Sequence, residues 1–211
     1  MILSIETSTE VCSIAIHQDG KLIAENTSHE SYSHAERLAP MIQETMAAHN
    51  ISNAELKAVA VSAGPGSYTG LRIGTSTAKG LCYALDIPLL TVNTLESMLE
   101  GLPDAYEGYL RCPMIDARRM EVYCLLANDE NEVVNAVEAK IIDETSFHEE
   151  LNKQKILFYG NGAEKCKSVI RSENAVFLDA ITPHARNVGV IANRYFAAQK
   201  FADLAYFEPE Y

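Results

Sequence analysis

The residues of this sequence with the clearest chemical potential are the glycines and hydroxyl side chains between Gly64 and Gly74. The stretch Gly-Pro-Gly-Ser-Tyr-Thr-Gly-Leu-Arg-Ile-Gly follows an apolar run at 58–61 and leads into a helix predicted over 71–85. A glycine-rich loop before a helix can bind an anion, because free N–H groups and the helix dipole favour negative charge there. The stretch lacks both the Gly-Lys-Ser/Thr ending of a P-loop and the G-x-G-x-x-G spacing of a dinucleotide motif.

Small residues continue from this loop into the predicted helix at every fourth position. They are Gly66, Gly70, Gly74, Ala78 and Cys82. A spacing of four places them along one ridge of the helix. Glycine inside a helix costs about 1 kcal/mol relative to alanine, and both Gly74 and Gly80 lie inside this one. The ridge therefore predicts that another backbone or a ligand lies very close. Spacing alone favours helix packing and leaves phosphate binding as the alternative.

The composition limits the classes of function. With 17 basic and 29 acidic residues the net charge is 17 − 29 = −12, so the chain is a poor stand-alone nucleic-acid binder. If RNA is involved, another subunit should supply much of the positive surface. Five cysteines without a C-x-x-C pair predict a reduced, cytoplasmic protein without a zinc ribbon. No signal peptide and no apolar run of about 18 residues is seen, so no membrane association is expected.

The elements that must position the glycine-rich stretch follow a regular order. Strands predicted at 1–5, 11–17 and 21–25 form a meander, with Asp19-Gly20 as a hairpin turn. A helix at 33–49 begins with the capping-box pair Ser33 and Glu36. The strand at 58–61, the helix at 71–85, a strand at 89–93 and a helix at 95–101 complete a β-β-β-α-β-α-β-α order. This order predicts a mixed sheet with helices packed on it.

A loop at 102–111 separates a second half that loosely repeats this plan. Strands are predicted at 112–115, 121–127 and 132–141, followed by alternating short helices and strands. A last helix is predicted to open at Thr182-Pro183, because proline favours the first turn of a helix. The fold class is therefore α/β in two lobes, residues 1–102 and 103–211.

Five segments together resemble the bacterial TsaB family. They are Ile5-Glu6-Thr7-Ser8-Thr9, Ser33-His34-Ala35-Glu36-Arg37-Leu38, the glycine-rich stretch 64–74, Ala78-Lys79-Gly80 and Ile115-Asp116-Ala117-Arg118. The resemblance covers most of residues 1–125. It implies an actin-like ATPase fold with a reduced second lobe and a role in threonylcarbamoyl modification of tRNA adenosine 37. The family acts as a non-catalytic partner of the catalytic paralogue TsaD, together with the small ATPase TsaE.

The resemblance also implies that a catalytic centre is absent. The catalytic relatives carry two histidines four residues apart in a segment similar to 89–98, where a metal can bind. The matching positions here are Thr94 and Met98, so no metal and no cofactor are expected. An active ATPase of this fold would have an aspartate where this chain has Glu6. A peptidase is disfavoured because neither H-E-x-x-H nor G-x-S-x-G occurs.

The predicted partner interface combines the small ridge with the apolar stripe of the helix at 33–49, a stripe that can equally be an ordinary buried face. Its predicted residues are His34, Leu38, Met41, Ile42, Met46, Gly70, Arg72, Gly74, Thr75, Ala78, Lys79 and Cys82. Arg72 and Lys79 are expected at the rim or as solvated charge. A homodimer of the isolated chain would use the same surface.

The alternative is an ATP-binding enzyme of the sugar-kinase and actin type. In that interpretation Thr7, Ser8, Gly64 and Gly66 contact the nucleotide. Gly160-Asn161-Gly162 would contribute from the second half, although asparagine and glycine are also ordinary turn residues.

Overall fold

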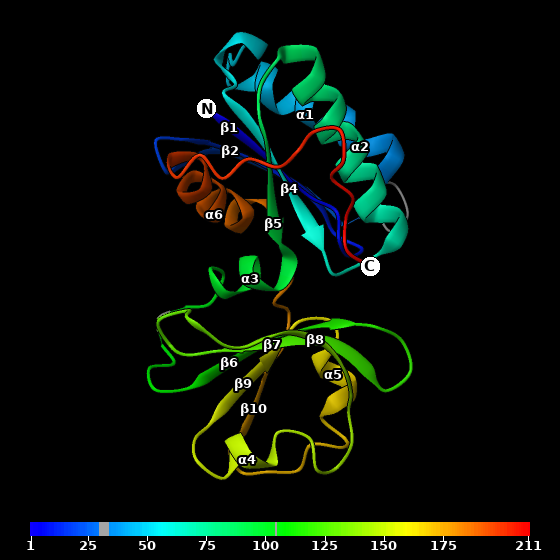
Figure 1. Ribbon diagram of the computed structural model, residues 1–211, viewed down its shortest axis with the longest axis vertical. Helices are drawn as coiled ribbons and strands as arrows, with labels where there is room; N and C mark the ends of the chain where they lie inside the picture. The colour runs from blue at the N-terminus through cyan, green and yellow to red at the C-terminus, as the bar shows by residue number, and fades with distance from the viewer. Residues whose placement is uncertain (30–33, 104) are drawn as a thin grey trace. The chain divides into compact units, whose positions relative to one another are not determined.

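The computed structural model describes residues 1–29, 34–103 and 105–211 (Figure 1). The helix cap predicted at Ser33 lies outside the described residues. The chain forms two compact units, Met1–Ser97 with Pro183–Tyr211, and Met98–Thr182. Among the described residues, no helix combines the length and apolar character needed to cross a bilayer.

The first unit contains the predicted β-β-β-α-β-α-β-α order, which is confirmed. Its elements are β1 (Ile2–Glu6), β2 (Cys12–Gln18), β3 (Lys21–Ser28), α1 (His34–Ala48), η1 (Asn53–Glu55), β4 (Ala58–Gly64), α2 (Tyr68–Leu85), β5 (Leu89–Asn93), α3 (Thr94–Leu99) and α6 (Ala185–Ala197). The strands form a sheet in the order β3-β2-β1-β4-β5. β1 pairs antiparallel with β2 and parallel with β4, and β4 pairs parallel with β5.

Helices cover both faces of this sheet, with α1 and α2 on one face and α6 on the other (Figure 1). Alternate residues of β4 face opposite sides of the sheet and pack against the helices on each side. Val59 and Val61 pack with α1 and α2, whereas Ala58 and Ala60 pack with α6. A strand buried on both faces needs a continuous apolar sequence, which explains the run at 58–61.

The last helix corrects the predicted division of the chain. The predicted second lobe, residues 103–211, loses Pro183–Tyr211 to the first unit, because Val188, Ile191 and Ala192 of α6 pack on the first sheet. The helix also begins at Ala185, after the predicted Thr182-Pro183 opening. The Ala185 N–H donates to Ser13 Oγ at 2.9 Å, so a side chain of β2 satisfies a free N–H of the helix start.

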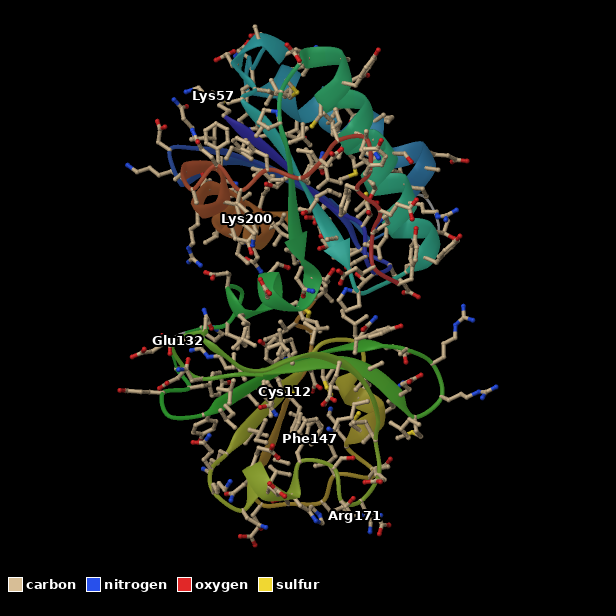
Figure 2. The ribbon with its side chains drawn as sticks, in the orientation of Figure 1. Lys57, Cys112, Glu132, Phe147, Arg171 and Lys200 are labelled. Carbon is tan, nitrogen blue, oxygen red and sulfur yellow. The ribbon has the colours of Figure 1, made fainter. Side chains whose placement is uncertain are left out.

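The second unit repeats the strand order of the first. Its elements are β6 (Leu110–Asp116), β7 (Glu121–Ala127), β8 (Val133–Ile141), α4 (His148–Leu151), β9 (Ile156–Tyr159), α5 (Ala163–Cys166) and β10 (Ala175–Leu178). The sheet order β10-β9-β6-β7-β8 again has a meander on one side and parallel strands on the other. Figure 2 shows Cys112 and Phe147 inside this unit, and both belong to its buried core.

Candidate functional site

The glycine-rich stretch packs against the turn that follows β1. A Cβ atom at position 66 would overlap the backbone of Ser8, and one at position 70 would overlap the carbonyl oxygen of Thr7. A Cβ at position 74 would overlap the Thr7 hydroxyl. The close approach predicted from the spacing is confirmed, and the neighbour is a turn of the same chain.

Hydrogen bonds join the same two segments. The Ser67 N–H donates to the Ser8 carbonyl at 2.6 Å, and the Thr7 hydroxyl donates to the Gly70 carbonyl at 2.8 Å. Thr7 and Ser8 are fully buried. Thr7, Ser8 and Gly66, which were predicted to contact a nucleotide, therefore take part in the chain's own packing. A nucleotide contact at this turn stays a prediction.

Glu6 lies at the centre of this packing. Its carboxylate accepts hydrogen bonds from the Ser8 N–H, at 2.6 Å, and from the Ser62 hydroxyl of β4. Burial raises the pKa of the Glu6 carboxyl, and the hydrogen bonds from Ser62 and Ser8 oppose that rise. The residue that departs from the aspartate of active relatives thus links β1, the following turn and β4.

The buried position of Glu6 predicts a pH-dependent effect on stability. Because the pKa is raised in the folded state, the carboxyl stabilises the fold below its unfolded pKa, and that stabilisation is lost as the pH rises through the folded pKa. Glu6→Gln removes this titration. We expect the free energy of unfolding of Glu6→Gln, relative to the wild type, to rise between pH 5 and pH 8 in urea titrations. Glu44→Gln, at an exposed position of α1, is the control, and a difference for Glu6→Gln that is constant with pH would contradict the prediction.

Ten of the twelve residues predicted for the partner interface are buried within the first unit. They are His34, Leu38, Met41, Ile42, Met46, Gly70, Gly74, Thr75, Ala78 and Cys82. Six of them, Leu38, Met41, Ile42, Met46, Ala78 and Cys82, belong to the core between α1, α2 and the sheet, and none of the ten is on the surface of the folded chain. This corrects the prediction, because the apolar stripe of a helix that covers a sheet must face the sheet.

The opposite face of the same two helices carries a second set of small residues. Ala39 and Ala47 are exposed on α1, and Ser76, Gly80 and Ala84 are exposed on α2. A Cβ atom at Gly80 would have nothing within 4 Å. The two helices contact one another (Figure 1), and their exposed side is hereafter called the outer face of α1 and α2. This surface was not predicted from the sequence. Gly80 could have indicated it, because this glycine does not belong to the ridge of Gly66, Gly70, Gly74, Ala78 and Cys82.

Arg72 and Lys79, the remaining two predicted residues, contact the end of the chain. The Arg72 Nε donates to the Tyr211 hydroxyl at 2.8 Å, and the Lys79 ammonium donates to the carbonyl oxygens of Ala205 and Phe207 at 3.2 and 3.1 Å. No local sequence pattern relates these positions, which are more than 120 residues apart. From the sequence, Arg72 and Lys79 were expected at the rim of an interface or in solvent, and neither expectation included a contact with residues 205–211.

The positions of the relatives' histidine pair contain no metal ligands. Thr94 and Met98 are both fully buried, and a Cβ at Gly160 would press on Met98 and on the Met114 carbonyl. Asn161 Oδ1 accepts a hydrogen bond from the Asp116 N–H at 3.0 Å, so Gly160-Asn161-Gly162 forms a packed turn. Among the described residues, no group of three or more histidine, cysteine or acidic side chains could hold a metal ion.

Neither the cysteine thiols nor the hydroxyl of Ser62, which lies beside Glu6, is placed to act as a nucleophile. All five cysteines are buried and free, and burial raises the pKa of Cys12, Cys82 and Cys166 to about 11. Reactive cysteines require an accessible thiolate. The Ser62 hydroxyl donates to Glu6 and is fully buried.

Two five-stranded mixed sheets of the same strand order, with helices packed on them, define a two-lobed α/β fold of the actin-like class. The family of TsaD, tRNA N6-adenosine threonylcarbamoyltransferase, matches residues 22–211. The tRNA threonylcarbamoyladenosine biosynthesis protein TsaB of Escherichia coli K12 is 31% identical over all of this chain and 93% of its own length. The chain belongs to the TsaB family of tRNA threonylcarbamoyladenosine biosynthesis proteins.

Solved structures agree in fold. A Pseudomonas aeruginosa protein described as similar to peptidase YeaZ superposes with a TM-score of 0.86 at 24% identity, covering 100% of this chain and 98% of that one. The activator of 2-hydroxyisocaproyl-CoA dehydratase from Clostridium difficile superposes with a TM-score of 0.53 at 10% identity, covering 94% and 97% of the two chains. At these identities the likeness concerns the fold alone.

Proposed function

We propose that this chain is a non-catalytic subunit in the synthesis of threonylcarbamoyladenosine in tRNA, and that it binds the catalytic TsaD-type paralogue through the outer face of α1 and α2. The observation that carries the proposal is Gly80, an exposed glycine inside an 18-residue helix with open space beside it. Glycine there lowers helix stability by about 1 kcal/mol relative to alanine, without any intramolecular contact that requires it.

A surface of small residues on two adjacent helices suits a partner that is itself helical. Small side chains let a second pair of helices approach closely: Ser76 and Ala84 lie one turn on either side of Gly80 on α2, and α1 exposes Ala39 and Ala47. An ordinary specific complex buries about 800 Å² on each partner, which two helix faces can supply. The isolated chain would pair with itself through the same face, and TsaE would join the complex as its small ATPase.

Three features support the non-catalytic part of the proposal. The positions of the histidine pair are the buried Thr94 and Met98, Glu6 is engaged with Ser8 and Ser62, and the glycine-rich stretch is closed by the Thr7–Ser8 turn. With a net charge of −12, contact with tRNA is expected through the partner.

The partner contact is tested by filling the space beside Gly80. Gly80→Trp is expected to leave the thermal unfolding of the isolated chain within a few degrees of the wild type and to weaken binding to the catalytic paralogue by at least about 100-fold, because a bulky side chain prevents close helix approach. Light scattering of the mixed proteins measures the complex, and threonylcarbamoyladenosine formed on tRNA measures its activity.

Ala197→Trp, at an exposed position of α6 on the other face of the sheet, is the matched control and should bind normally. An intact complex with Gly80→Trp would overturn the proposed interface. Micromolar binding of ATP with turnover by the isolated chain, measured by calorimetry with Mg²⁺, would overturn the non-catalytic role and favour the enzyme alternative.

A further inference from the structure

Three residues of the glycine-rich stretch, the exposed Tyr68 and Arg72 and the buried Gly64, meet one segment, residues 203–211, hereafter the strap. The Glu210 N–H donates to the Ala63 carbonyl at 2.7 Å, and a Cβ at Gly64 would overlap the Glu210 carbonyl. The Tyr211 ring lies 4.4 Å from that of Tyr68, between centroids. Figure 1 shows the strap running beside α2. The motif therefore holds two separate segments of the chain, the turn after β1 on its buried side and the strap on its exposed side.

Lys79 holds the strap on both sides of Tyr206. Its ammonium group bonds to the carbonyl oxygens of Ala205 and Phe207, and Leu204 and Phe207 pack against the first core. Tyr206, between these anchored residues, is 85% exposed. The Tyr206 ring is therefore exposed to solvent, while the backbone on both sides of it is fixed by the hydrogen bonds from Lys79.

A second highly exposed tyrosine lies on α2, the helix that Lys79 joins to the strap. Tyr83 is 84% exposed and follows Lys79 by one helical turn, so the two side chains share a face of the helix. Among the large apolar side chains of the described residues, Tyr83 and Tyr206 are the two most exposed. Tyr83 also follows Gly80 by three residues, so the two are neighbours on the surface of α2.

The charge around these rings indicates the chemistry of their partner. The strap contains Asp203, Glu208 and Glu210 and no lysine or arginine. Glu208 and Glu210 are exposed. Tyrosine is enriched among the residues that dominate protein interfaces, since its ring buries a large area and its hydroxyl keeps a hydrogen bond. Arg72 and Lys79 of α2 lie against the strap, but its three carboxylates outnumber these two cations. Two tyrosines on such an acidic segment complement an apolar surface rimmed by lysine or arginine.

We propose that Tyr83 and Tyr206 anchor the catalytic subunit, whose basic surface lies against the strap, and that the interface extends from Gly80 across Tyr83 onto residues 203–211. This inference rests on the proposed function. Lys79 and Gly64 act as positioning residues, because they hold the strap and do not themselves reach the partner.

The test measures the affinity of the full chain for the catalytic subunit by calorimetry. Tyr206→Ala and Tyr83→Ala are each expected to weaken binding by about 30-fold, the effect of a strong interface anchor, while Tyr206→Phe retains most of the affinity. Ile141→Ala, which removes another highly exposed apolar side chain in the second unit, is the control and should bind within twofold of the wild type. Glu208→Gln with Glu210→Gln is expected to reduce the salt dependence of binding.

Hydrogen exchange separates anchoring from strap docking. The Glu210 amide should stay protected in Tyr206→Ala and lose protection in Lys79→Met, which is expected to weaken binding as well. If Gly80→Trp abolishes binding but Tyr206→Ala binds within twofold of the wild type, the strap proposal is overturned and the proposed function stands. If the wild-type chain does not bind the catalytic subunit at all, the proposed function fails and the strap proposal fails with it.

Discussion

Gly70→Ala is expected to destabilise the isolated chain by about 3 kcal/mol or more, because a forced overlap in a packed core requires the backbone to move. The added Cβ would overlap the Thr7 carbonyl oxygen, and this oxygen belongs to a fully buried turn. The same turn receives the hydrogen bond from the Ser67 N–H. The free energy of unfolding from urea titrations measures the effect.

Gly80→Ala is the matched control in the same helix and is expected to have the opposite sign. A Cβ at Gly80 would have open space around it, and alanine is favoured over glycine inside a helix by about 1 kcal/mol. A stabilised Gly80→Ala beside a destabilised Gly70→Ala would locate the close approach at the Thr7–Ser8 turn. Equal stabilities of the two variants would contradict this packing.

Met41→Ala is expected to cost about 2–5 kcal/mol of stability in the isolated chain, the usual range for removing a large side chain from a core. Met41 is fully buried between α1 and the first sheet. An interface residue of an unbound subunit would instead be exposed, and its truncation would change the stability of that subunit little. The urea midpoint of the chain without any partner therefore decides between the two roles.

Gln43→Ala, two residues along α1 and exposed, is the control and should change stability by no more than about 0.5 kcal/mol. A Met41→Ala variant as stable as the wild type, with its defect confined to complex formation, would restore the interface role that the sequence pattern suggested. A destabilised Met41→Ala together with an unchanged Gln43→Ala, the results we expect, would instead assign the apolar stripe of α1 to the core.

Much of the fold could be predicted because its signals are local. The hairpin at Asp19-Gly20, the apolar run of β4 and the four-residue spacing of α2 each depend on neighbouring residues only. The strand order of the second sheet also follows the predicted meander and crossovers. The return of α6 to the first sheet could not be predicted, because an amphipathic helix specifies an apolar face and not the sheet that covers it.

In the candidate site too, local features could be predicted from the sequence, whereas contacts between distant segments could not. The sequence by itself determined that something must approach the ridge of Gly66, Gly70 and Gly74 very closely, since missing side chains allow contact with any backbone. Only the tertiary structure decided that the Thr7–Ser8 turn fills this space and that the space beside Gly80 is open. Contacts between distant segments, such as those of Lys79 with the strap, depend on the tertiary fold, and no local periodicity in the sequence predicts them.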